Sequence, residues 1–162
     1  MNVTLQYVQE KDKSILVHLM ELYRYDFSEM SNQDVNNHGL YGYPRLDYYW
    51  SEENRAPYLI MVGENITGFV LLRKIMEENK NYYMIAEFFI LKKYRKIGIG
   101  QRASHEVFDI HKGEWEVPVA KENVKAQEFW NKVIEKYTKN QFAVIFKTHW
   151  DGLIYSFSNN ER

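Results

Sequence analysis

The sequence predicts a single α/β domain in which strands and amphipathic helices follow one another along the whole chain. Its 162 residues suit one domain and are enough to bury a sizeable core. Apolar runs with strand character alternate with segments in which apolar residues recur every three or four positions. No repeat, low-complexity segment or linker divides the chain. We therefore assign residues 1–162 to one layered domain.

Composition excludes several classes of function. The net charge is −1, so the chain lacks the basic character expected of a nucleic-acid-binding domain. It has no cysteine, which excludes disulfides, cysteine zinc sites and an acyl-cysteine intermediate. The five histidines show no metal-ligand spacing, and no apolar run approaches the ~20 residues needed to cross a bilayer. With no signal-peptide pattern at the N-terminus, we expect a cytoplasmic protein without a bound metal.

The first elements are predicted to be a strand over residues 3–8 and a helix over residues 14–27, capped by Asp12 or Ser14. The polar residues 28–45 then form a long irregular connection, with a short helix near residues 46–50. Loops of this length in a small domain often bind ligands, although an ordinary surface loop is the alternative. The candidate binding residues of this segment are Asp34, Tyr41, Tyr43 and Asp47.

The middle of the chain is predicted to form an antiparallel meander, and the last part alternates helices with strands. The meander strands cover residues 56–62, 66–73 and 82–90, separated by polar turns. The later elements are a helix that follows Gly100 and ends near Gly113, a strand over 114–120, a helix that Asn123 caps, and strands over 142–146 and 153–157.

A basic, glycine-containing turn joins the strand that ends at Ile90 to the helix that follows Gly100. Glycines let the backbone approach a ligand, and the first turn of a helix presents unpaired N–H groups to an anion. This order of strand, turn and helix predicts a phosphate site. Ala103 stands where a dinucleotide-binding turn needs its third glycine, and no Gly-Lys-Ser/Thr run of a P-loop is present.

Two motifs give the chain a family resemblance. Arg95-Lys96-Ile97-Gly98-Ile99-Gly100 fits Arg/Gln-x-x-Gly-x-Gly/Ala, and Asn123-x-x-Ala126-x-x-Phe129-Trp130 is similar to Asn-x-x-Ala-x-x-Leu/Phe-Tyr. Together with the element order, they make the chain resemble the GNAT superfamily of N-acetyltransferases over essentially its whole length. The resemblance implies a mixed, mostly antiparallel sheet of about seven strands with helices on both faces. It also implies transfer of an acetyl group from acetyl-CoA to a primary amine by direct attack in a ternary complex.

By this resemblance, backbone groups of the strand bind the pantetheine and the thioester oxygen, and amides of the turn bind the pyrophosphate. It also implies that Asn123 touches the pantetheine or the acyl end and that Trp130 lies along the thiol end. The implied cofactor-binding residues are Phe88, Phe89, Ile90, Arg95, Lys96, Ile97, Gly98, Ile99, Gly100, Gln101, Asn123 and Trp130. Two alternatives stay open: Asn123 as a helix cap only, and Trp130 as a packing residue only.

Glu87 is a carboxylate in a strongly apolar strand, where burial is costly unless the group is paired. The family often uses a carboxylate on this strand as the base, so Glu87 is the candidate catalytic residue; a cross-strand pair with Lys or Arg is the alternative. Trp130 stands where many relatives have a Tyr that protonates the leaving thiolate. An indole cannot do this, so the general acid stays open, and Tyr137 lies two turns further along.

Two other functions compete with this interpretation. One is a non-catalytic acyl-CoA-binding module, favoured by the missing Tyr, and the other is a different nucleotide-phosphate binder. Acidic residues near the long loop favour a cationic small molecule over a protein as the amine-bearing acceptor. The final strands could pair across a homodimer. The identity of the acceptor and the use of acyl groups other than acetyl stay open.

Overall fold

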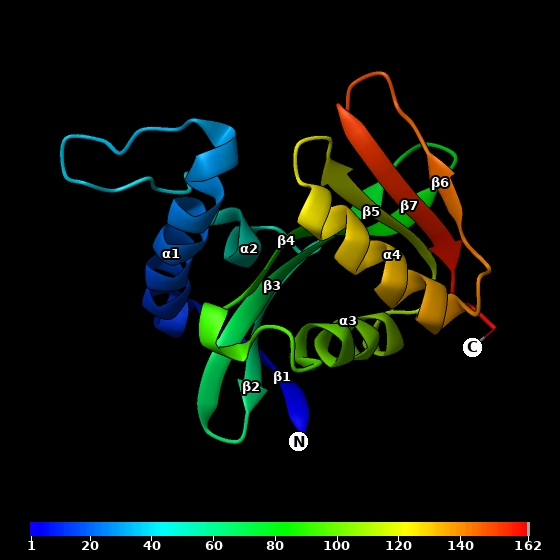
Figure 1. Ribbon diagram of the computed structural model, residues 1–162, viewed down its shortest axis with the longest axis horizontal. Helices are drawn as coiled ribbons and strands as arrows, with labels where there is room; N and C mark the ends of the chain where they lie inside the picture. The colour runs from blue at the N-terminus through cyan, green and yellow to red at the C-terminus, as the bar shows by residue number, and fades with distance from the viewer. Residues whose placement is uncertain (162) are drawn as a thin grey trace.

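The computed structural model describes residues 1–161 of the chain (Figure 1). Its strands are β1 (Val3–Tyr7), β2 (Arg55–Val62), β3 (Asn65–Met76), β4 (Asn81–Ile90), β5 (Glu114–Ala120), β6 (Ala143–Ile145) and β7 (Gly152–Ser158). Its α-helices are α1 (Lys13–Ser31), α2 (Tyr48–Ser51), α3 (Ile99–Ile110) and α4 (Val124–Thr138), with single 3-10 turns η1 (Glu10–Asp12) and η2 (Lys92–Tyr94).

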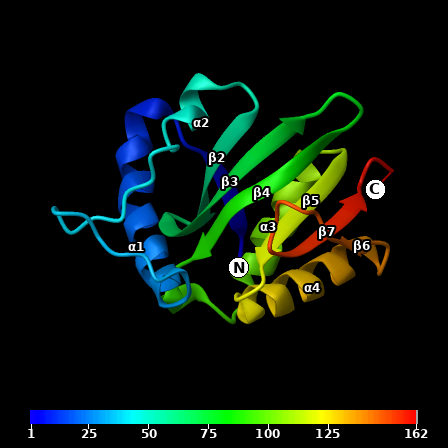
Figure 2. The ribbon, with the colours of Figure 1, turned by 90° about the horizontal axis from the view of Figure 1, so that it is seen from above.

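One mixed sheet contains all of these strands, in the order β1-β2-β3-β4-β5-β7-β6 (Figure 2). Every neighbouring pair is antiparallel except β4 and β5, which run parallel. The parallel pair follows from the crossover through α3, since parallel strands need a long connection. The predicted mixed, mostly antiparallel sheet is therefore confirmed.

Helices cover both faces of the sheet, as predicted. On one face, Leu16 and Met20 of α1 pack with Tyr49 of α2 and with Phe69 and Phe89 of the sheet. The opposite face packs against α3 and α4, whose core residues are Val107, Phe108, Trp130, Val133 and Ile134. Alternate residues of a strand point to opposite faces, so β4 contributes side chains to both layers.

The long loop is shorter than predicted because α1 continues to Ser31 before Asn32 ends it in a left-handed conformation (φ 53°). Asp12 precedes the helix but makes no side-chain cap hydrogen bond. Residues 32–47 then form an irregular excursion that extends away from the sheet (Figure 1, cyan).

Candidate active site

The parallel strands β4 and β5 separate after only two paired positions. Tyr83 pairs with Trp115 and Met84 with Glu116, and the register ends there. β5 continues to pair with β7 as far as Ala120, so β5 turns toward β7 while β4 turns toward β3. Within residues 1–161, the edge of residues 85–90 that faces β5 therefore has no partner strand, and its backbone groups are open to a ligand except the carbonyl of Ile90, which accepts a hydrogen bond from Arg95.

A β-bulge lies in the middle of this open edge. Leu71 of β3 faces Glu87, whereas the next residue, Leu72, faces Ile85. Ala86 is thus the extra residue of β4, and such bulges bend a strand and redirect its side chains. Glu87 consequently contacts α1 on one face of the sheet, while Phe88 packs against α4 on the other.

The glycine turn after β4 has a backbone suited to an anion. Lys96 and Gly98 have positive φ angles of 63° and 88°, and α3 begins at Ile99. Within the described residues, the N–H groups of 96–101 donate to no backbone carbonyl, and Arg102 is the first residue to donate into the helix, to Gly98. Six consecutive free amides at a helix N-terminus fit a phosphate group.

Aromatic side chains join the glycine turn to the open edge of β4. A Cβ on Gly100 would lie 3.0 Å from Cε2 of Phe129, so glycine here lets the ring of Phe129 pack closely on the turn. The ring of Phe129 stacks on Phe88 with centroids 5.7 Å apart, and Trp130 meets Phe88 edge-on at 5.0 Å. Trp130 is buried and packs here, and its contact with the thiol end of the donor stays a prediction.

Arg95 is engaged in an ion pair within the fold. Its Nη2 donates to Oδ2 of Asp26 on α1 at 2.7 Å, and its Nε donates to the carbonyl of Ile90 at 2.7 Å. Lys92 adds a longer contact of 3.6 Å to Asp26. The guanidinium thus ties α1 to the turn, whereas Lys96 is an exposed residue of the turn that forms no ion pair within residues 1–161.

The other predicted cofactor residues divide into exposed and buried positions. Ile97 is exposed and Gln101 half-buried, so both line the turn from outside. Ile99 and Ile90 are buried together beneath it, whereas Phe89 is buried on the opposite face, against α1. Asn123 accepts a hydrogen bond from the amide of Ala126 at 3.1 Å and therefore caps α4, as one of the two interpretations predicted.

The carboxylate of Glu87 is held by two phenols. Tyr23 of α1 donates its hydroxyl to Oε2 at 2.5 Å, and Tyr43 of the loop donates to Oε1 at 3.2 Å. The cross-strand pair with Lys or Arg is absent from the described residues, where Glu87 forms no ion pair. Burial raises the pKa of Glu87, and the two phenol hydrogen bonds and Arg24 oppose this rise.

The same cluster raises the pKa of each phenol. Burial is the main cause for Tyr23 and Tyr43, and the adjacent negative charge of Glu87 adds to it. For Tyr49 of α2, burial raises the pKa to about 12, while Arg55 opposes the rise. All three phenols therefore stay protonated at neutral pH, and Tyr23 and Tyr43 remain hydrogen-bond donors to the carboxylate.

The four loop residues that the sequence singled out lie in different places. Tyr43 donates a hydrogen bond to Glu87, whereas the backbone amide of Tyr41 donates to Oε2 of Glu21 at 3.0 Å. Asp34 is exposed, and Asp47 forms an exposed ion pair with Lys13 at 3.1 Å, at the start of α1. Only Tyr43 of the four therefore reaches the candidate base.

Sequence reasoning missed Tyr23. Its helical spacing with Leu16, Leu19 and Met20 placed it in the apolar stripe of α1, where core packing is the usual role. The sequence contains no local sign of the contact, because 64 positions separate Tyr23 from Glu87.

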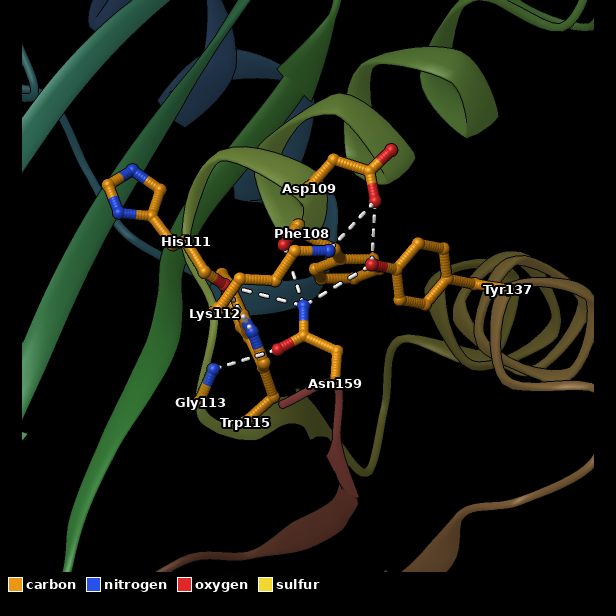
Figure 3. A network of polar contacts seen from close by, with 8 residues as sticks. All are labelled: Phe108, Asp109, His111, Lys112, Gly113, Trp115, Tyr137 and Asn159. Atoms are coloured by element: carbon orange, nitrogen blue, oxygen red, sulfur yellow. Dashed lines mark hydrogen bonds and ion pairs between the residues drawn. The ribbon is translucent and has the colours of Figure 1, made fainter. Parts of the chain in front are cut away.

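Tyr137 belongs to a polar network at the C-terminal end of α3 (Figure 3). Its hydroxyl donates to Oδ1 of Asp109 at 2.8 Å and accepts from the amide nitrogen of Asn159 at 3.2 Å. Asn159 also donates to the carbonyl of Phe108 at 2.6 Å and accepts from the amide of Gly113 at 2.8 Å. This network fastens the C-terminal end of α3 to the end of β7, so Tyr137 has a structural role there.

No group of three or more His, Asp or Glu side chains within residues 1–161 is arranged to hold a metal ion. Over the same residues, no helix combines the length and apolar character required to span a membrane.

Known structures share this fold. PaiA N-acetyltransferase from Thermoplasma acidophilum, solved with coenzyme A, superposes with a TM-score of 0.66 at 16% identity, over 98% of this chain and 100% of that one. Arabidopsis thaliana Naa50, in complex with a CoA-Ac-MVNAL bisubstrate analogue, superposes with a TM-score of 0.64 at 18% identity, over 98% of this chain and 100% of that one. An aminoglycoside acetyltransferase from an uncultured soil metagenomic sample, in complex with sisomicin, superposes with a TM-score of 0.63 at 18% identity, over 90% of this chain and 94% of that one.

At these identities the likeness concerns the fold, and no curated protein sequence matches the chain significantly. The family model of the GNAT acetyltransferases matches residues 16–134, which include most of α1, the open edge of β4, the glycine turn and most of α4. The chain therefore belongs to the GNAT acetyltransferase family.

Proposed function

We propose that this protein transfers the acetyl group of acetyl-CoA to the primary amine of a small-molecule acceptor, by direct attack in a ternary complex. The observation that carries the proposal is the position of Glu87, a half-buried carboxylate at the bulge of the strand edge that β5 leaves open. A proton acceptor is needed there because an alkylammonium group, with a pKa of ~10.4, is mostly protonated at neutral pH.

The open edge and the turn fit the donor. The backbone groups of residues 88–90 other than the Ile90 carbonyl would hold the pantetheine arm, and the free amides of 96–101, with the exposed Lys96 of the same turn, would hold the diphosphate. When bound, acetyl-CoA supplies an acetyl group activated as a thioester. Fixing the donor and the amine in one cleft lowers the entropic cost of their reaction.

Glu87 accepts the proton of the ammonium group, directly or through water, and Tyr23 and Tyr43 hold its carboxylate in place. Trp130, at the position of the missing tyrosine, packs on Phe88, and the hydroxyl of Tyr137 donates to Asp109, so neither residue is proposed as the acid. A thiolate with a pKa near ~8.5 is a tolerable leaving group, so we propose that it departs without a dedicated side-chain acid.

A small cationic acceptor is supported by the chemistry around Glu87, where a carboxylate and tyrosine rings suit an ammonium group. The acidic residues near the loop add less support than the sequence suggested, because Asp26 and Asp47 are already paired with Arg95 and Lys13. The aminoglycoside and peptide complexes of the structural neighbours define two acceptor classes to test. A cytoplasmic location and a homodimer stay predictions.

The test is a measurement of free thiol released from acetyl-CoA in the presence of polyamines, aminoglycosides or a peptide with a free N-terminus. We expect amine-dependent release together with an amine product that has gained one acetyl group. Binding of acetyl-CoA without release for any amine would favour the non-catalytic module, and absence of binding would overturn the proposal. ATP and NAD are the controls for a different nucleotide-phosphate binder.

A further inference from the structure

Two phenols donate hydrogen bonds to Glu87, one from a helix and the other from a loop. Tyr23 belongs to the middle of the 19-residue helix α1, and its hydroxyl lies 2.5 Å from Oε2 of Glu87. Tyr43 belongs to the irregular loop of residues 32–47, and its hydroxyl lies 3.2 Å from Oε1. One carboxylate oxygen is thus fixed by the scaffold and the other by a loop.

The loop is itself clamped to α1 at one residue. Oε2 of Glu21 accepts a hydrogen bond from the amide of Tyr41 at 3.0 Å, and Oε1 accepts from the amide of Gly42 at 3.1 Å. Gly42 has a φ of 70°, a left-handed conformation that glycine adopts without strain. Because Gly42 immediately precedes Tyr43, this clamp determines where the phenol lies.

A second contact supports the same segment. The guanidinium carbon of Arg24 lies 5.9 Å from the ring centroid of Tyr43, and Nη2 of Arg24 donates to Gln33 at 2.7 Å. Glu21 and Arg24 are neighbours on α1, so one turn of this helix holds both ends of the loop. The charged and titratable groups around Glu87 are Tyr23 and Arg24 of α1, Tyr43 of the loop, and Tyr49 of α2.

We propose that Tyr43 is a positioning residue for Glu87, and that Glu21 controls the orientation of this carboxylate by clamping the loop that carries Tyr43. The proposal rests on the proposed function in one respect, the role of Glu87 as proton acceptor. An amine that enters between the loop and the sheet takes the place of the longer, loop-borne hydrogen bond and leaves that of Tyr23 intact.

The test is a titration of the Glu87 carboxyl carbon by NMR in protein labelled with ¹³C-glutamate, with Glu87→Gln identifying the signal. A phenol that donates to the carboxylate stabilises its ionised form, so Tyr43→Phe should move the midpoint to higher pH by about one pH unit. Glu21→Ala should move it in the same direction by a smaller amount. The controls are Tyr25→Phe and Glu29→Ala, two exposed residues of α1, which should titrate as the parent protein does.

The same variants are assayed for acetyl transfer. In Tyr43→Phe and Glu21→Ala, the acidic limb of kcat/KM should shift to higher pH by the same amount, with the KM for acetyl-CoA unchanged. If the carboxyl titration shifts and no amine is acetylated, the proposed function fails and the positioning role stands. If Tyr43→Phe and Glu21→Ala both titrate as the parent protein does, the positioning role is overturned, whatever the activity.

Discussion

The donor and acceptor sides of this site are built in different ways. The donor side is local in sequence and is made of backbone, since the amides of residues 96–101 and the open edge of β4 follow one another along the chain. The acceptor side is made of side chains brought together from distant positions, with Tyr23 and Tyr43 separated from Glu87 by 64 and 44 residues. The donor side therefore depends on the path of the backbone, and the acceptor side on tertiary contacts that single substitutions can remove.

This difference predicts that substitutions on the two sides affect different kinetic parameters. On the acceptor side, Glu87→Gln should lower kcat by about 10²- to 10³-fold, because proton transfer by a positioned side chain contributes that much. The affinity for acetyl-CoA, measured by calorimetry, should stay within about twofold, since the donor side uses no part of this carboxylate. A kcat within a few fold of the parent value would remove Glu87 from the mechanism.

On the donor side, Gly98→Val should weaken acetyl-CoA binding by about tenfold or more. Gly98 has a φ of 88°, which a β-branched residue adopts only with strain of about 1–3 kcal/mol, so the amides of the turn would move. Gly63→Val is the matched control, because Gly63 also has a positive φ of 59° and open space around it, in the β2–β3 hairpin. Equal loss of affinity in both variants would show that general destabilisation is the cause.

Substitutions in the ion pair of Arg95 and Asp26 test whether Arg95, the arginine of the first motif, has a structural role or binds phosphate. Both side chains are about one-third exposed, so Arg95→Gln and Asp26→Asn should each cost up to about 1 kcal/mol in the free energy of unfolding. The double variant should cost little more than either single one. Acetyl-CoA affinity should change by less than about threefold, whereas a tenfold loss confined to Arg95→Gln would assign the guanidinium to the phosphate.

The smallest expected effect is at the cap of α4. Asn123→Ala should lower the free energy of unfolding by about 1 kcal/mol, because the amide of Ala126 loses its side-chain acceptor. Asn123→Ser, which retains a cap, should be close to the parent protein in a denaturant titration. If acetyl-CoA affinity fell equally in both variants while stability differed, Asn123 would contact the donor in addition to capping the helix.

The parts of this molecule that could be predicted from sequence are those in which the signal is local. Strand alternation, helical spacing and the glycine turn predicted the order of elements, and β5 begins at Glu114 and ends at Ala120 as expected. The end of α1 was placed too early, because its polar last turn from Ser28 to Ser31 resembles a loop in composition. The partners of Glu87 could not be predicted, since the tyrosines that hold it have the spacing of core residues or lie in a loop without periodicity.

The roles of individual motif residues also depend on tertiary contacts that the sequence does not reveal. Arg95 is the arginine that the first motif requires, but the sequence does not show that the fold places Asp26 beside its guanidinium. Trp130 occupies the position of a tyrosine that often acts as an acid, and its burial on Phe88 gives the residue a packing role. The motifs thus predicted the path of the backbone better than they predicted the contacts of each side chain.

The central claim is that acetyl-CoA lies along the open edge of β4 with its diphosphate on the glycine turn. Amide chemical shifts in ¹H–¹⁵N NMR spectra, followed during titration with acetyl-CoA, test it most directly. We predict the largest changes at residues 88–90 and 96–101, with small changes at the β2–β3 hairpin and in β6. Saturable binding that moves other amides and leaves those of Gly98 and Gly100 unchanged would contradict the account.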